Sequence, residues 1–161
     1  MVNHSLTIEV PTCSVSQVIE VPQYDNWSHD INISLIRTDS ENNKRYFTIP
    51  SDCNVNIVYR NDKGELITPK GVVEIINNFR GQVVYHVDPV LLNSYGSKNV
   101  SLVLTRVNDD NRVETLLSLT FLVNVTKNNV KNVPDGYTIE SWYNRYIMNW
   151  NSVFGSVIMN E

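Results

Sequence analysis

The chain lacks most of the features that mark common classes of protein. Only six of its 161 residues are glycine, and they stand singly rather than in a phosphate-binding loop. No stretch approaches the roughly 18 apolar residues of a membrane-spanning helix. Charged residues make up 19% of the chain and the net charge is −4, so a basic face for phosphates or a polybasic membrane anchor is not expected. We therefore expect no nucleic-acid partner and no membrane partner.

Catalytic patterns are equally scarce. The three histidines, His4, His29 and His86, lie far apart in the sequence, and none has a partner at the spacing of a metal site. The chain has no G-x-S-x-G nucleophile elbow and no cysteine–histidine constellation. We therefore expect no catalytic residue, no metal and no cofactor, and we predict that the protein is not an enzyme.

The cysteines and the first residues bear on the compartment. Cys13 and Cys53 each lie in a strand-like stretch, and we expect small core residues there, with a disulfide between them as the alternative. The opening MVNHSLTIEV lacks the basic region and apolar core of a signal peptide, which predicts synthesis in a cytosol.

Short alternating runs are abundant and predict a mainly β fold. Apolar residues alternate within 30–37 and again within 99–107, as in half-buried strands. Polar turns such as 61–64 and 108–111 recur at roughly ten-residue spacing. With a hydrophobic fraction of 42%, this pattern indicates an antiparallel β-sandwich, immunoglobulin-like or jelly-roll-like, over residues 1–126.

Three finer expectations follow from residue types. Pro11 and Pro22 end two short N-terminal runs, which we expect to be edge or arm strands because proline cannot donate to a ladder. The run 113–125 is apolar on both faces near its centre, which predicts a strand buried between layers. The segment 90–95 is expected to cross between strands with one helical turn.

The composition changes after the last strand. Residues 127–136 are polar and include Pro134-Asp135-Gly136, which predicts a linker. From 137 to 160 the apolar residues recur at steps of three and four, which predicts a C-terminal amphipathic α-helix. Its apolar face comprises Ile139, Trp142, Tyr143, Tyr146, Ile147, Trp150, Val153, Phe154, Val157 and Ile158.

This face covers an arc of roughly 160° and must be buried against something large. It either packs on its own sandwich or forms a helix bundle or partner interface. The second interpretation is favoured because the face follows a linker and is rich in tryptophan and tyrosine, which are enriched at interfaces. It predicts a homo-oligomer held through the helix.

A second cluster of aromatics suggests another class of function. Tyr24 and Trp27 lie in a turn-like stretch, and together with Tyr46 and Phe47 they could line a sugar-binding surface. The same residues suit a core or a rim equally well. A carbohydrate-binding or adhesin-like module, with Tyr24 and Trp27 as candidate ligand residues, is therefore the alternative function.

The central part of the chain resembles a known pattern of strands and turns. It has a D-x-G turn at 62–64, a Gly-x-Val-x-Tyr strand at 81–85, a crossing segment at 90–96 and a final F-x-V-x-V strand at 121–125. Over residues 30–125 this order resembles the N-terminal domain of phage baseplate upper proteins, the BppU-type family.

The resemblance implies a structural role in a virion. In that family the sandwich attaches to the central hub of the tail tip, and a helical segment leads outward toward receptor-binding proteins. It implies a non-enzymatic tail or baseplate component, made in the cytoplasm of a bacterial host and taking part in host attachment. The family's distal part does not follow the predicted helix here, which leaves open a short family member or a piece of a longer one.

Overall fold

The alternating runs form strands in the computed structural model of the chain, which describes residues 1–10, 14–15 and 17–128, and only the backbone of 14 and 15. Residues Met1–Lys127 make up one compact unit. Its elements are β1 (Val2–Val10), β2 (Ser14–Val15), β3 (Ile19–Pro22), β4 (His29–Thr38), β5 (Lys44–Tyr46), β6 (Asn54–Arg60), β7 (Leu66–Ile67), β8 (Val73–Asn77), β9 (Gln82–His86), the 3₁₀ turn η1 (Leu91–Asn93), β10 (Gly96–Val107) and β11 (Val113–Thr126).

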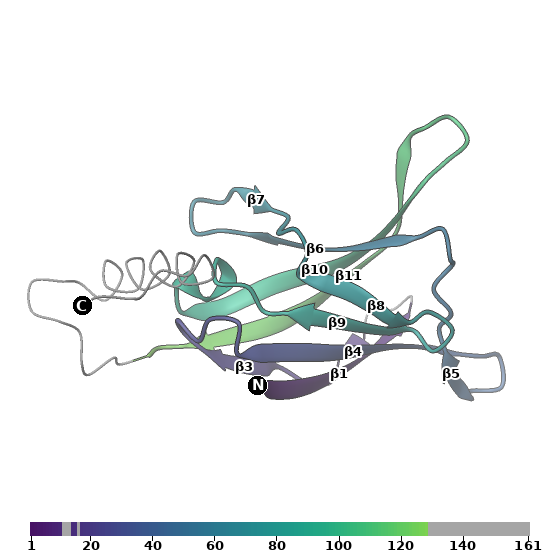
Figure 1. Ribbon diagram of the computed structural model, residues 1–161. Coiled ribbons are helices and arrows are strands. Elements are labelled where there is room, and N and C mark those ends of the chain that lie inside the picture. The colour runs from purple at the N-terminus through teal and green to yellow at the C-terminus, as the bar shows by residue number, and fades with distance from the viewer. Residues whose placement is uncertain (11–13, 16, 129–161) are drawn as a thin grey trace, which may run out of the picture. The chain divides into compact units, whose positions relative to one another are not determined.

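The strands form two sheets that pack face to face (Figure 1). Sheet A has the order β2-β1-β4-β9-β8, and β5 pairs with one end of β4. Sheet B has the order β3-β11-β10-β6-β7. The prediction of a mainly β sandwich is confirmed over the described residues.

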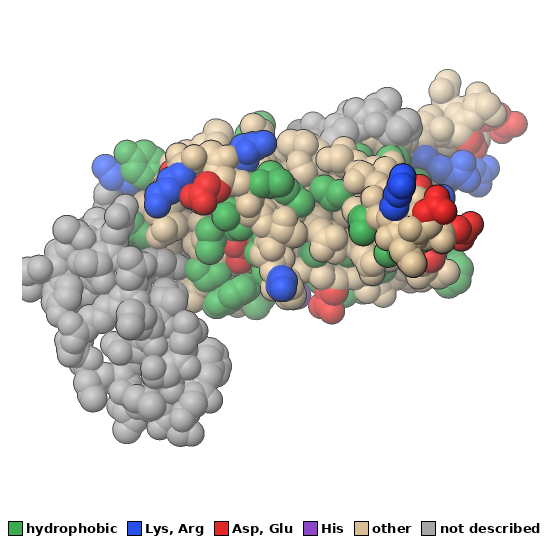
Figure 2. All heavy atoms as spheres, turned by 90° about the horizontal axis from the view of Figure 1, so that it is seen from above, with side chains coloured by type: hydrophobic (Ala, Val, Ile, Leu, Met, Phe, Trp, Pro, Cys, Tyr) green, Lys and Arg blue, Asp and Glu red, His purple; other side chains and the backbone are tan. Residues whose placement is uncertain are grey.

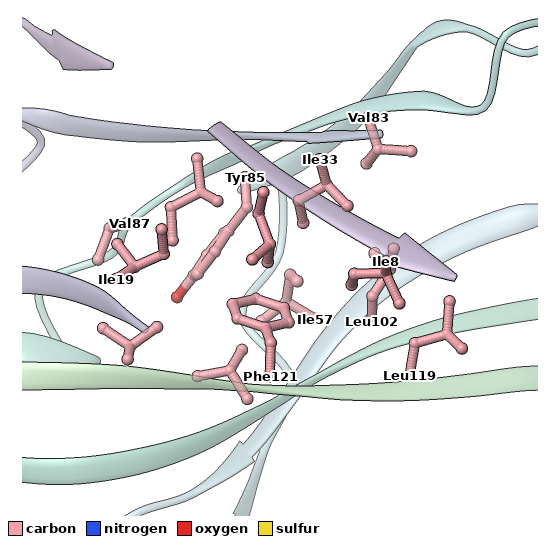
Figure 3. Close-up of a cluster of buried hydrophobic side chains, with 14 of the residues drawn as sticks. Ile8, Ile19, Ile33, Ile57, Val83, Tyr85, Val87, Leu102, Leu119 and Phe121 are labelled. Carbon is pink, nitrogen blue, oxygen red and sulfur yellow. The ribbon is translucent and has the colours of Figure 1, made fainter. Parts of the chain in front are cut away.

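The core lies between the sheets and comes from the predicted alternation. Ile31, Ile33 and Leu35 of β4 are fully buried, as are Val100, Leu102 and Leu104 of β10. In Figure 3, side chains such as Ile33 and Tyr85 of sheet A point toward Ile57, Leu102 and Phe121 of sheet B. Each aliphatic side chain buried in this way stabilises the fold by about 1.5–3 kcal/mol.

The prediction that the sandwich is antiparallel is wrong for two strand pairs. β1 runs parallel to β4 over nine residue pairs, and β3 runs parallel to β11. A hairpin forces antiparallel pairing, but β1 and β4 are separated in the chain by β3, which lies in the other sheet. No turn between neighbours sets their direction, and the residue pattern of a half-buried strand is the same in either orientation.

Two predictions about strand positions also need correction. β3 lies at a sheet edge, as expected from Pro22, but β1 lies between β2 and β4 rather than at an edge. β11 is not buried between layers. Its exposed Ser118, Thr120 and Leu122 alternate with the buried Leu119, Phe121 and Val123. Leu122 is 39% exposed, so an apolar residue on the second face of β11 does not mean that this face is buried.

The turns are built as the sequence predicts. Gly64 closes the β6–β7 hairpin at φ +77°, and Asn111 has φ +60° in the β10–β11 hairpin. η1 supplies the helical turn expected between β9 and β10. At Gly81, φ is +62° and a Cβ atom would lie 2.4 Å from the carbonyl oxygen of Phe47, so the close approach of two backbones there requires glycine.

Several sequence predictions lie outside the described residues. These are the C-terminal helix at 137–160, nearly all of the linker at 127–136, and Cys13. Cys53 is a buried free thiol, and burial and then the Asp52 carboxylate raise its pKa. Among the described residues, no helix has the length and apolar content needed to cross a membrane.

Candidate functional site

The turn between β3 and β4, residues 23–28, carries both predicted ligand residues and is called the Trp27 turn below. Tyr24 has φ +65° and Trp27 has φ +55°. For an L-residue with a bulky side chain, this left-handed conformation costs roughly 1–2 kcal/mol. Tyr24 is half-buried, whereas Trp27 is 46% exposed. The turn therefore displays a large aromatic ring from a backbone conformation that tryptophan disfavours.

Hydrogen bonds from neighbouring segments hold this conformation. The backbone N–H of Gln23 donates to Thr126 O at 2.8 Å, and that of Tyr24 donates to Leu92 O at 3.1 Å. The side-chain amide of Gln23 donates to Asn93 O at 3.2 Å. The turn is thus attached to the end of β11 and to η1, segments far away in the sequence.

Asn26 adds a second unfavourable feature to the turn. Its backbone N–H donates to Tyr24 O at 2.9 Å, a tight local contact. Its side-chain Oδ1 is buried and has no hydrogen-bond partner among the described residues. Buried polar atoms are nearly always paired, and unfavourable backbone geometry tends to gather at functional sites. These features make the Trp27 turn the main candidate site of the described chain.

A partly buried histidine network is bonded to the turn. His29, the first residue of β4, is 5% exposed, and its Nε2–H donates to Asp25 Oδ2 in the turn. Its Nδ1 lies 2.8 Å from Nε2 of His4 on β1, and the two rings stack with centroids 5.0 Å apart. Burial and then the neighbouring His29 lower the pKa of His4.

Sequence analysis missed this network because its members are separated in the chain. His4 lies 25 residues from His29, and only the parallel pairing of β1 with β4 brings them together. One available indication was the alternation of β1, which places His4 on the inner face with Leu6 and Ile8. Among the described residues, no group of three histidine, cysteine or acidic side chains has the geometry to hold a metal ion.

A buried carboxylate supports the loop that carries η1. Asp88 is 2% exposed and accepts hydrogen bonds from the hydroxyls of Tyr85, at 2.6 Å, and Tyr59. Burial and the Asp88 charge raise the pKa of both tyrosines. Tyr85 belongs to sheet A and Tyr59 to sheet B, so this cluster joins the sheets beside η1. It therefore fixes the segment on which the Trp27 turn rests.

A cleft of about 200 Å³ lies between η1 and the β6–β7 hairpin. At its edge Ser94 Oγ donates to Asp62 at 2.8 Å, and Lys98 Nζ donates to Ser94 at 2.6 Å and to Asp62 at 3.2 Å. These bonds lower the pKa of Asp62, whose side chain is largely exposed. A serine beside a lysine is found in some hydrolases, but here both tie the hairpin tip to β10, and we interpret the cluster as structural.

The four aromatics proposed to line one sugar-binding surface do not come together. The Trp27 turn precedes the first residue of β4, whereas β5, with Tyr46, pairs with its last three residues. The ten residues of β4 span about 30 Å. The expectation of one surface including Tyr46 and Phe47 is therefore wrong, and of the four only Tyr24 and Trp27 lie in the same turn.

On the face shown in Figure 2, hydrophobic side chains are mixed with polar ones, and most charged side chains lie toward the two ends of the described body. The predicted helix face from Ile139 to Ile158 lies outside the described residues and stays a prediction.

Comparison with known proteins finds likeness only at the level of structure. No family model matches the chain, and no curated protein matches its sequence. The N-terminal domain of ORF48 of phage TP901-1 has a similar fold, with a TM-score of 0.57 at 13% sequence identity, over 78% of this chain and 98% of that domain. Human CDH23 EC21-23 matches at a TM-score of 0.31 and 13% identity, over 71% of this chain and 37% of that one, too weakly to inform the comparison.

Proposed function

We propose that this protein is a non-enzymatic structural component of a phage tail tip or baseplate. The sandwich docks on the central tail hub, and the segment 137–160 links it outward toward receptor-binding proteins. The chain is a homo-oligomer through the apolar face of that segment. It is made in the cytoplasm of the bacterial host and resides in the virion tail.

The observation that carries this proposal is the likeness to a domain of a phage protein. The match spans 98% of that domain, so it concerns the whole sandwich and not a shared pair of hairpins. The order of strands and turns over residues 30–125 resembles the baseplate upper family independently of that match. The described residues add a sandwich whose two sheets are joined by the Asp88 cluster and a turn that exposes Trp27, features that suit docking better than chemistry.

The oligomeric state of the full chain tests the assembly part of the proposal. We expect a multimer by size-exclusion chromatography with light scattering, and a monomer when Trp142→Asp and Trp150→Asp are combined, because both lie on the predicted apolar face. The matched control combines Ser141→Asp and Ser152→Asp on the predicted polar face and should remain a multimer. A monomeric wild-type chain, or equal dissociation of both double variants, contradicts the proposal.

The Trp27 turn favours a second candidate function, a carbohydrate-binding or adhesin-like module. An exposed indole held by a strained turn suits stacking on a sugar ring. Glycan-array binding by the full chain that is lost in Trp27→Ala, and retained when the exposed Leu66 of β7 is changed to alanine, would support this function over docking on a hub. Absence of binding to any glycan removes it.

A further inference from the structure

Three segments of the chain meet at the partly buried His4 and the buried His29. His4 comes from β1 and His29 from β4, while Asp25 comes from the Trp27 turn. Close by, the backbone N–H of Val2 donates to Ser28 O at 2.8 Å, so the start of β1 is also bound to the turn. The pair therefore lies where the N-terminal strand, the central strand and the displayed aromatic are joined.

The hydrogen-bond pattern limits how many protons the pair can hold. The Nε2–H of His29 donates to the Asp25 carboxylate, which leaves His29 Nδ1 to share a single proton with His4 Nε2. With both rings neutral, His4 donates and His29 accepts. With one added proton, His29 donates to His4 and its charge faces Asp25.

A second added proton has no acceptable arrangement. Both nitrogens of the 2.8 Å contact would then carry hydrogens, and two imidazolium rings would stack with centroids 5.0 Å apart. Like charges at this range repel strongly when partly buried, and two donors cannot bond to each other. The doubly protonated state can form only if the rings separate.

The surrounding groups offer little compensation for a second charge. Asp25 is already bonded to His29. Asp30 lies on the opposite face of β4 and is bonded to His86, and the Asp88 carboxylate is bonded to two tyrosines. The N-terminal amine belongs to Met1, an exposed residue that precedes β1, and is itself positive.

We propose that His4 and His29 form an acid-sensitive latch that holds the start of β1 and the Trp27 turn in place, and that double protonation opens it. Opening separates His4 from His29 and moves His4 out of its partly buried position. It also removes the support that Asp25 and Ser28 give to the strained turn, which relaxes from its left-handed backbone. Acidification thus changes how Trp27 is displayed, whatever partner the turn has.

The sign of the effect follows from the depressed pKa of His4. A histidine whose folded-state pKa lies below the unfolded value near 6.5 contributes stability that is present above about pH 6.5 and is lost as the pH falls through the folded value. The latch is therefore closed at neutral pH. Opening of the singly protonated pair takes up one proton, a tenfold change per pH unit, and opening of the neutral pair takes up two.

NMR of the full chain tests the latch. Ring resonances should titrate as a coupled pair. Hydrogen-exchange protection of the Val2 and Tyr24 amides, corrected for intrinsic rates, should fall below pH 6.5 by up to about a hundredfold per pH unit where the closed pair is neutral and by up to about tenfold where it holds one added proton. The variant His4→Gln keeps a donor for His29 but cannot take a proton, so this loss should vanish. The control His86→Gln, on the outer face, should leave it unchanged.

Two results would overturn the latch. One is an unchanged acid-dependent loss of protection in a His4→Gln chain whose circular dichroism matches the wild type. The other, which needs no variant, is a wild-type titration in which His4 and His29 take up protons independently while the two amides stay protected down to pH 4.5.

Discussion

Two histidine networks lie on opposite faces of β4, one at His29 and the other at the adjacent Asp30. His29 points into the sandwich, where it contacts His4 and one carboxylate. Asp30 points outward and accepts a hydrogen bond at 2.7 Å from the Nδ1–H of His86. The other ring nitrogen of His86, Nε2, donates to Glu74 at 3.3 Å. The pKa of His4 is lowered by burial and by its neighbouring histidine. That of His86 is lowered by burial but raised more strongly by its two carboxylates, so the net shift is upward.

The difference shows that strand alternation alone can reverse the response of one residue type to pH. The inner network loses stabilising interactions on acidification. The outer network loses stabilising interactions as the pH rises, because its hydrogen bonds require a protonated His86. Inner polar groups also lack water as a substitute partner, whereas outer ones have it, so substitutions on the two faces should differ in size as well as in sign.

The largest effect is expected at the inner carboxylate beside this network. Asp88→Ala leaves the buried hydroxyls of Tyr59 and Tyr85 without their acceptor. An unsatisfied buried donor costs about 1–3 kcal/mol, so we expect a loss of about 2–4 kcal/mol in the free energy of unfolding, measured from urea denaturation.

The matched change on the outer face is Asp30→Ala, which removes the carboxylate that pairs with His86. Because water replaces the lost bond, we expect a loss of about 1 kcal/mol or less at pH 6. If the two alanine variants are equally unstable, burial does not distinguish the two faces and the comparison fails.

The sequence could predict the inner and outer faces of individual strands but not what meets across them. Alternation assigned Ile31, Ile33 and Leu35 to the core because a period of two is a local property. The His4–His29 contact depends on a parallel pairing between strands that no hairpin connects, and local patterns carry no information about it. The strain at Trp27 was hidden for a related reason: its positive φ is imposed by bonds to η1 and β11, not by its own preference.

An intermediate effect is expected from the backbone of the Trp27 turn. Glycine adopts positive φ without a Cβ penalty, whereas alanine does not. The free energy of unfolding of Trp27→Gly should therefore exceed that of Trp27→Ala by about 1 kcal/mol, which would appear as a higher thermal midpoint. At an exposed strand position with ordinary φ, such as Val113, the order should reverse. The same order at both positions would contradict the left-handed conformation of the turn.

The smallest effect is expected at His86, and its sign is what matters. Because its folded-state pKa is raised, its contribution is fully present below about pH 6.5 and is lost as the pH rises through the folded value. The side chain is about a third exposed, so solvent screening keeps the contribution below about 1 kcal/mol. His86→Gln should therefore destabilise the protein slightly at pH 5.5 and hardly at all at pH 8.5, measured by urea denaturation at both values.

His4→Gln should show the opposite trend, losing less free energy of unfolding relative to wild type at pH 5.5 than at pH 8.5. Parallel trends for the two variants would mean that the inner and outer histidines respond to protons alike.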